Sequence, residues 1–348
     1  MYTYSIGPLT GQLKPKYRRI SQAIGEGYVP SKGVDVYIDL GTLIKSMTGS
    51  RKFLNALPFA DGVSIERDII SSVLSTFKHW KDFTRQFHSD DVRIFMMYTS
   101  MDVHDMPEHE IMKQYMMPYV HKYEDTRYQQ LSYYWNEAMK KVTIVMKYIP
   151  QGYLIKCDRF DSYVLPQLLT TGERDRIIAT GDPFFTTYHY TPNTIIIYSK
   201  FGQNGLTQLT DPQMIVQSVS HIDDSIMNTF INNRVFYNTL QAIIGYKDRG
   251  ILGITALGVS VVATDIIRGL EQKTIPQDPK SIDSVLPIIN PSYHSYMKQV
   301  YPLIDVELHT KLVPPSLLTE VKTSMVDLLD IDGLSQLSID GMNLMELL

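Results

Sequence analysis

Three aspartates follow short, strand-like apolar runs, and this feature constrains the fold of the 348-residue chain most strongly. Asp39 ends the run in VDVYIDLGTLI, Asp161 follows a short run in KCDRFDSYVLPQLL, and Asp182 follows the run in RIIATGDPFFTTY. Carboxylates at the carboxyl ends of parallel strands converge in one crevice. Clustered aspartates suit a hard divalent cation, Mg²⁺ or Mn²⁺. The pattern therefore predicts a parallel sheet with a metal site at its carboxyl edge.

Each of these aspartates also has a plainer interpretation. Aspartate is a common helix N-cap and turn residue, so any one of the three is explained by capping alone. Their shared setting favours a common site, because clustered carboxylates repel one another and a cation relieves that repulsion. Both interpretations stay open on the sequence alone.

Strand and helix patterns alternate over the first 200 residues. Strands are expected at 34–40, 92–98, 152–156, 176–179 and 194–198. Helices are expected near 64–87, 131–146 and 160–170. This alternation predicts an α/β fold with a mainly parallel central sheet flanked by helices.

The chain after residue 210 has a different character, because we find no strand pattern there. Helices are expected at 211–219, 223–246, 258–272, 293–300 and 315–330. We therefore divide the chain into an N-terminal extension (1–30), an α/β domain (31–209), a helical subdomain (210–330) and an acidic-apolar tail (331–348).

The composition excludes several classes of protein. The net charge is −4, so a bound polyanion needs a local basic patch on an acidic body. The single cysteine, Cys157, excludes an internal disulfide and a cysteine-rich zinc site. We find neither a signal peptide nor a run of transmembrane length, so a cytoplasmic protein without a membrane partner is expected. Enrichment in Ile, Met, Tyr and Asn is typical of an AT-rich genome, such as that of a virus.

A glycine-rich turn, GILGITALG, is the second element with chemical meaning. Gly250, Gly253 and Gly258 separate small apolar residues, and a helix is expected to follow. Backbone groups in such a helix–turn–helix can contact a phosphate or a K⁺ ion without obstruction by side chains. The alternative is a tight turn between two packed helices.

Basic and aromatic residues alternate in the segment 113–127. The basic residues are Lys113, Lys122 and Arg127, and they lie among several tyrosines. This pattern can hold a single strand through phosphate contacts and stacking. An exposed helix with tyrosines on its packing face explains the pattern equally well.

Taken in order, these segments resemble the flap endonuclease and 5′→3′ exonuclease family, particularly its phage ribonuclease H-like members with a PIN-like fold. The resemblance is carried by VYIDLGTLI, VRIFMMYTS, PYVHKYEDTR, FDSYV, TGDPFF, NTIIIYSK, GYKDRGILGITALG and SYMKQVYPLIDVEL. It implies that Asp39, Asp161 and Asp182 are catalytic metal ligands. It further implies a helix–three-turn–helix around residues 250–258. Together with the patterns above, the predicted nucleic-acid contacts are Lys113, Lys122, Arg127, Arg249, Gly253, Thr255 and Gly258.

Several positions depart from the family pattern. Where the family has further acidic residues, this chain has Arg159, Ser162, Phe184, Tyr246 and Arg249. Hydrolysis by two metals needs cations about 3.5–4 Å apart, one of which activates water. Three aspartates can hold one Mg²⁺ with waters completing its octahedron, and little remains for a second.

Two functions follow from the resemblance and its departures. The first is a degenerate, nucleic-acid-binding family member with reduced or absent hydrolysis. The alternative is an active Mg²⁺-dependent, structure-specific 5′ nuclease. Either would bind DNA or RNA–DNA, branched or with single-stranded 5′ ends. The tail 331–348 is expected either to dock into a protein assembly or to cover the core of the chain itself.

Overall fold

The computed structural model describes the greater part of the chain. The described residues are 33–49, 57, 61–84, 91–99, 126–157, 161–170, 174–198, 208–209, 233–246, 251, 253, 256–313, 338–339 and 342–343. The predicted extension 1–30 and helices 211–219 and 315–330 lie outside them.

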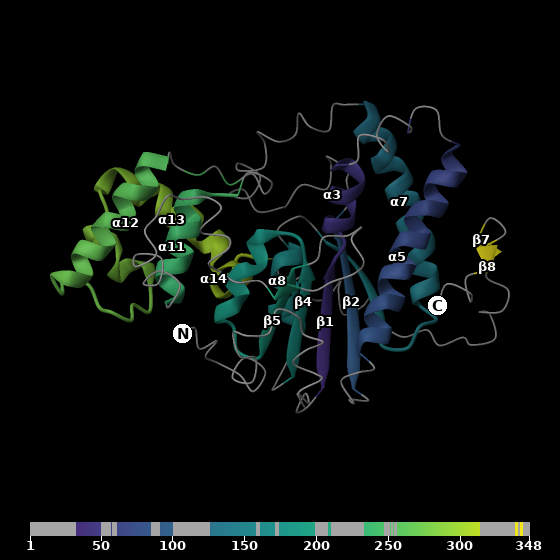
Figure 1. The fold of residues 1–348 in the computed structure, drawn as a ribbon, viewed down its shortest axis with the longest axis horizontal. Coiled ribbons are helices and arrows are strands. Elements are labelled where there is room, and N and C mark those ends of the chain that lie inside the picture. Colours follow the sequence, from purple (N-terminus) through teal and green to yellow (C-terminus); the bar gives the residue numbers. More distant parts are fainter. Residues whose placement is uncertain are drawn as a thin grey trace.

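A six-stranded sheet of order β3-β2-β1-β4-β5-β6 forms the centre of the molecule (Figure 1). Its strands are β1 (Val34–Asp39), β2 (Val92–Thr99), β3 (Gly152–Cys157), β4 (Asp175–Thr180), β5 (Thr194–Tyr198) and β6 (Gln208–Leu209). The first five pair in parallel, and the two-residue β6 is antiparallel to β5. The predicted α/β class with a mainly parallel sheet is confirmed.

The sheet is buried on both faces, which explains why its strands are apolar at almost every position. On β1, Val36 and Ile38 belong to one core cluster, whereas Tyr37 belongs to another. Successive side chains of a strand point to opposite faces, so the alternation assigns each cluster to one face. On the second face, Tyr37, Phe95 and Tyr153 stack across three neighbouring strands.

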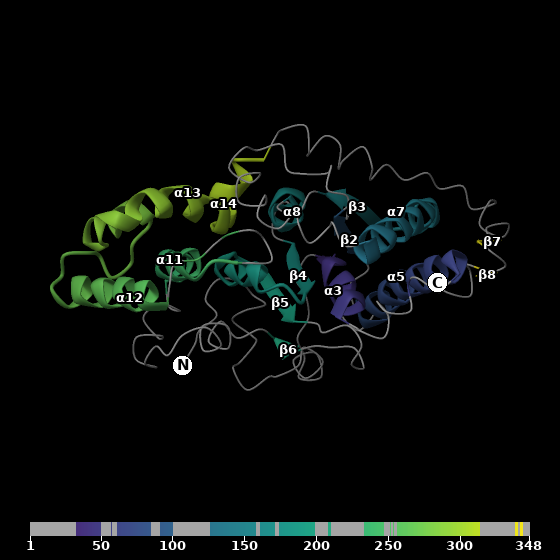
Figure 2. The same cartoon turned by 90° about the horizontal axis from the view of Figure 1, so that it is seen from above.

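Helices cover the two faces differently. The cluster containing Val36 is covered by α3 (Gly41–Gly49), α5 (Gly62–Thr84) and α7 (Thr126–Met146). The opposite cluster is covered by α8 (Asp161–Leu169), the 3₁₀ helix η4 (Pro183–Tyr190) and the helical subdomain. Figure 2, a view from above, shows α8 and the α5–α7 pair beside the sheet.

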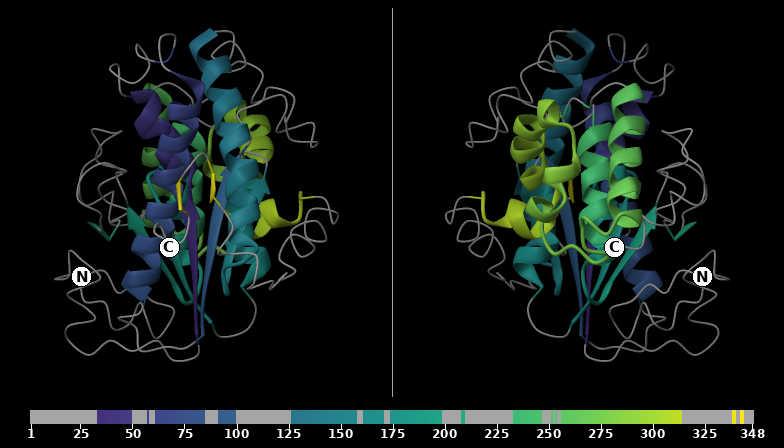
Figure 3. Two further views of the ribbon diagram at one scale, coloured as in Figure 1. Left: turned by 90° about the vertical axis from the view of Figure 1, so that its right-hand side faces the viewer. Right: turned by 90° about the vertical axis from the view of Figure 1, so that its left-hand side faces the viewer.

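The helical subdomain is built from α11 (Arg234–Ile244), α12 (Ala256–Glu271), α13 (His294–Ile304) and α14 (Val306–Thr310). Three 3₁₀ turns connect α12 to α13: η6 (Ile282–Ser284), η7 (Leu286–Ile288) and η8 (Pro291–Tyr293). Figure 3 shows from two sides that these helices and the α5–α7 pair lie at opposite ends of the molecule.

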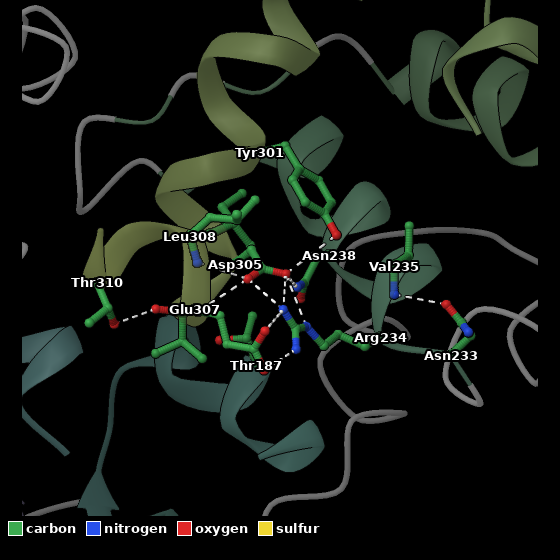
Figure 4. Close-up of polar contacts among 12 residues, drawn as sticks. Thr187, Asn233, Arg234, Val235, Asn238, Tyr301, Asp305, Glu307, Leu308 and Thr310 are labelled. Atoms are coloured by element: carbon green, nitrogen blue, oxygen red, sulfur yellow. Dashed lines mark hydrogen bonds and ion pairs between the residues drawn. The ribbon is translucent and has the colours of Figure 1, made fainter. Parts of the chain in front are cut away.

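Asp305 ties this subdomain together from a buried position between α13 and α14 (Figure 4). Its carboxylate accepts hydrogen bonds from the backbone amides of Glu307 and Leu308 and so caps α14. It also accepts from Arg234 at 2.7–3.0 Å and from Asn238 at 3.1 Å, both on α11. Because one carboxylate joins α11 to the start of α14, Asp305 has a structural role here.

The secondary structure differs from expectation in several places. Helix α3 and η4 were not expected; both are short and begin within three residues of a strand end. The expected helix 223–246 begins at Arg234 in the described chain, because the Asn233 side chain caps the Val235 and Phe236 amides. The expectation of no strand after residue 210 is wrong, since β7 (Ser338–Ile339) pairs antiparallel with β8 (Met342–Asn343). Two-residue strands are too short to show a period.

Candidate functional site

The carboxyl edge of the sheet brings two of the predicted aspartates together. Strands β1 and β4 are neighbours, so Asp39, the last residue of β1, and Asp182, which follows β4, lie at adjacent strand ends. The Thr180 hydroxyl donates to Asp39 Oδ2 at 2.8 Å, and its oxygen accepts from the Asp182 amide at 2.9 Å. One hydroxyl therefore links the two aspartate positions.

Further hydrogen bonds join the loop after β1 to the loop after β4. The Gly41 amide donates to Asp39 Oδ1 at 2.9 Å, and the Thr42 hydroxyl donates to Asp39 Oδ2 at 3.4 Å. The Thr42 oxygen accepts from the Gly181 amide at 2.6 Å. Asp39 and Thr42 thus hold the start of α3 against the β4 loop.

Asp182 caps a helix, as the plainer interpretation predicts for any single aspartate. It lies at the N-cap of η4, and its Oδ1 accepts from the Phe184 amide at 3.0 Å. Asp161 is the first residue of α8, on the same side of the sheet. Its side chain lies outside the described residues, so a cation shared by all three aspartates stays a prediction.

The described residues do not fit a centre with two cations. Asp39 is 6% exposed and Asp182 is 7% exposed, and the oxygens of both accept hydrogen bonds from the protein. Within the part of the chain that the structure describes, no three His, Cys, Asp or Glu side chains lie close enough to hold a metal. A buried carboxylate that already accepts such bonds has less capacity left for a hydrated cation.

Aromatic rings lie beside Asp182. Phe184 is fully buried, and its ring meets the Tyr246 ring edge-on with centroids 4.8 Å apart. It also lies 4.3 Å from the Tyr163 ring of α8. Phe184 and Tyr246 are two positions at which the resemblance implies acidic residues, so an aromatic contact stands where further carboxylates were expected.

Burial controls the ionisation of Tyr246. Desolvation raises the pKa of its hydroxyl well above the usual value, and the nearby Tyr237, Tyr163 and Asp182 raise it further. The hydroxyl is therefore protonated at neutral pH and donates to Gln241 Oε1 at 2.7 Å. It supplies a neutral donor, and not a charge, to this part of the molecule.

The predicted glycine-rich turn lies between α11 and α12. Tyr246 and Ile251 exchange backbone hydrogen bonds of 2.8 and 3.1 Å, which close the base of the turn. Gly245 has φ +75°, and a Cβ atom at Gly253 would collide with the carbonyl oxygen of Ile244. Glycine is required at both positions, because the backbones approach too closely for a side chain.

The other predicted contacts are only partly described. Gly253 is exposed beside the end of α11. Arg127 lies in the first turn of α7 and Gly258 in α12, but their surroundings lie outside the described residues. Lys113, Lys122, Arg249 and Thr255 lie outside them altogether. Their roles, and that of K⁺ at the 250–258 turn, stay predictions.

Sequence reasoning missed the threonines of the site. Thr42 and Thr180 are buried, and their hydroxyls connect the two loops. The available signal was their position, because each lies within three residues of a predicted aspartate in DLGT and TGD. Short hydroxyl side chains near strand ends often bond neighbouring backbone groups, as they do here.

Comparison with known proteins gives only distant likenesses. No family model matches the chain. No curated protein matches it. Among solved structures, the bacteriophage T5 5′-exonuclease with bound zinc is similar at 11% identity and a TM-score of 0.47, covering 84% of this chain and 99% of that one.

A second solved structure comes from the same phage. It is the T5 flap endonuclease in a pseudo-enzyme–product complex with DNA and metal ions. It is 12% identical, covers 84% of this chain and 98% of its own, and has a TM-score of 0.44. The motifs predicted a resemblance to the same kind of protein that these comparisons return, at TM-scores of 0.47 and 0.44. Likeness of this degree carries no information about activity.

No helix in the described part of the chain combines the length and the apolar character that crossing a membrane requires.

Proposed function

We propose that this protein is a flap endonuclease-like, nucleic-acid-binding protein in which metal-dependent phosphodiester hydrolysis is reduced or absent. The proposal rests on the burial and the hydrogen bonding of Asp39 and Asp182. Both are more than nine-tenths buried and bonded to the protein, and Phe184 and Tyr246 pack together beside Asp182. At most one cation, Mg²⁺ or Mn²⁺, is held here, by these two residues and Asp161.

A single cation does not complete the two-metal reaction. One metal activates water and the other stabilises the leaving oxygen, so loss of either removes part of the stabilisation of the transition state. Each 1.36 kcal/mol lost slows the reaction tenfold. A fixed positive charge such as Arg249 can partly offset phosphate charge but does not generate hydroxide at neutral pH.

The binding partner is DNA or RNA–DNA, branched or with a single-stranded 5′ end. Lys113, Lys122 and Arg127 contact the single strand, and Arg249, Gly253, Thr255 and Gly258 contact the duplex backbone. Support comes from the close approach of Gly245 and Gly253, which leaves the exposed Gly253 backbone without an obstructing side chain. The tail 331–348 docks into a protein assembly.

The alternative is an active Mg²⁺-dependent 5′ nuclease. It is favoured by the topology, because Asp39, Asp161 and Asp182 all follow strands of one parallel sheet at the same edge. The same fold therefore supports both proposals, and only a measurement of turnover separates them.

The test uses a labelled 5′-flap duplex with Mg²⁺ or Mn²⁺. We expect salt-sensitive binding and little or no product. Cleavage by the wild type that is lost in Asp182→Asn would contradict the proposal and establish the nuclease. Asn is a good N-cap, so this variant keeps the hydrogen bond to Phe184 while weakening a cation ligand.

The binding residues need a matched control. Lys122→Ala with Arg127→Ala is expected to weaken binding and to lower the slope of log K against log salt by about 1 per lost contact. Lys140→Ala with Lys147→Ala removes the same charge from exposed positions further along α7 and its end. Equal effects of the two pairs would show that net charge, and not a defined site, governs binding.

A further inference from the structure

Tyr246 connects two parts of the molecule that are far apart in the sequence. Its backbone closes the base of the glycine-rich turn by pairing with Ile251. Its ring packs on Phe184, which follows β4 at the carboxyl edge of the sheet. The residue therefore joins the turn to the edge directly.

Further contacts hold both partners of the Phe184–Tyr246 pair in place. Phe184 packs against Tyr163 of α8, and its backbone amide is bound by Asp182. The Tyr246 hydroxyl donates to Gln241 on the last turns of α11. A second contact nearby joins the same elements, since the Thr186 and Tyr237 hydroxyls are 2.7 Å apart. Edge-on aromatic pairs of this kind add about 0.5–1.5 kcal/mol beyond their buried area.

The contacts described connect the glycine-rich turn and the two loops at the sheet edge without a cation. The two loops at the sheet edge are joined by Asp39, Thr42 and Thr180, through hydrogen bonds of 2.6–2.9 Å. The turn is joined to the edge by the two rings. The contacts that a bridging metal would supply between acidic side chains are here made by hydroxyls, amides and aromatic surface.

We infer that the Phe184–Tyr246 contact, and not a divalent cation, fixes the described residues of the glycine-rich turn, Tyr246, Ile251 and Gly253, against the sheet for nucleic-acid binding. This inference rests on the proposed function and deepens it. Tyr246 is a positioning residue, because it acts through the exposed backbone around Gly253. Two consequences follow: association is independent of divalent cations, and it depends on the ring of Tyr246 more than on its hydroxyl.

The first experiment measures binding of the full-length protein to a labelled 5′-flap duplex by fluorescence anisotropy. It compares EDTA with Ca²⁺ at matched ionic strength, because screening alone alters phosphate contacts. We expect dissociation constants within about threefold of each other. Binding at least tenfold tighter in Ca²⁺ would overturn this inference alone. Absence of binding in both buffers would overturn the proposed function as well.

The second experiment compares Tyr246→Phe with Tyr246→Leu in EDTA. The phenylalanine variant keeps the ring and is expected to bind within about threefold of wild type. The leucine variant loses the edge-on contact, and we expect at least tenfold weaker binding and a salt slope lower by about 1 per lost phosphate contact. Partial unfolding reduces the active fraction but leaves that slope unchanged. An unchanged slope in Tyr246→Leu would therefore overturn the positioning role.

Discussion

Strand β1 carries a buried aspartate near each end, and the two are held in different ways. Asp35, at the amino edge, is fully buried and forms ion pairs of 2.6 and 2.9 Å with Arg93 and Arg174. Asp39, on the same face at the carboxyl edge, accepts from the Thr180 hydroxyl and the Gly41 amide. A guanidinium neutralises a carboxylate, whereas a hydroxyl or an amide orients it without changing its charge.

The two ends of β1 therefore differ in role. The ion pairs of Asp35 contribute to stability, whereas Asp39 belongs to the candidate site. Because the pairing at Asp35 uses charge, removing one partner leaves buried charge behind and is costly. The donors at Asp39 and Asp182 are uncharged groups, so removing one of them costs less and leaves a folded protein whose binding can be measured. Variants at the two edges test this division.

The largest effect is expected from Asp35→Ala. The change leaves Arg93 and Arg174 partly buried without this carboxylate, and we expect a loss of about 3–5 kcal/mol in the free energy of unfolding. Urea denaturation measures it. The matched control is Asp91→Ala, which removes a largely exposed partner of Arg174 and is expected to cost about 1 kcal/mol or less. Equal losses in the two variants would contradict the expected difference between the buried ion pairs of Asp35 and the exposed one of Asp91.

A smaller effect is expected from Thr180→Val at the other edge. The substitution removes the hydroxyl that bonds Asp39 and the Asp182 amide at a fully buried position. Leaving those groups without it is expected to cost about 1–3 kcal/mol, measured by the same denaturation. Thr180→Ser keeps the hydroxyl and should retain most of the stability. If serine were as damaging as valine, the methyl group and not the hydrogen bond would be the cause.

The cap at Asp182 gives the next effect. Asp182→Ala removes the acceptor for the Phe184 amide and is expected to lower stability by about 0.5–2 kcal/mol. Asp182→Asn keeps an acceptor and should remain close to wild type. Thermal melting of the two variants compares them. A stabilised Asp182→Ala would indicate that repulsion with Asp39 outweighs the cap, which would favour the shared cation site.

The smallest effect concerns pH. A hydrogen bond from Arg174 lowers the pKa of Asp91, and one from Arg234 lowers the pKa of Glu307. A carboxylate with a lowered folded pKa adds stability above its unfolded pKa of about 4, and this stability is lost as the pH falls through the folded value. Both groups are largely exposed, so we expect less than about 1 kcal/mol from each between pH 6 and pH 3.

The control for the pH effect is the double variant Asp91→Asn with Glu307→Gln. Its denaturation midpoint should fall less steeply than that of wild type over the same pH range. Identical slopes would assign the acid sensitivity to other carboxylates.

The order of strands and helices was predictable because apolar periodicity depends on local sequence. The runs around Val36, Ile94 and Ile177 gave β1, β2 and β4 to within one or two residues. Caps were harder to predict. Asn233 caps the start of α11 well inside the longer apolar pattern from which a helix was expected. Helix α3 was missed because it has only nine residues, too few to show a clear period.

The candidate site was predictable only in part. That Asp39, Asp161 and Asp182 follow strand ends could be read from the chain, whereas the partners of Asp39 and Asp182 could not. Thr180 bonds a residue 141 positions away, and Phe184 meets Tyr246, which lies 62 positions further along the chain. No local pattern encodes such a pairing.

The amino-acid sequence by itself determined the α/β class, the parallel strands and the residue types available at their ends, because these depend on short-range periodicity and composition. The tertiary structure alone decided what the aspartates do. Their roles depend on which donors and rings fold against them, and those come from distant segments whose positions are set by packing of both faces of the sheet. For that reason the carboxylate of Asp35 is neutralised by arginine at one edge of β1, whereas that of Asp39 is oriented by threonine at the other.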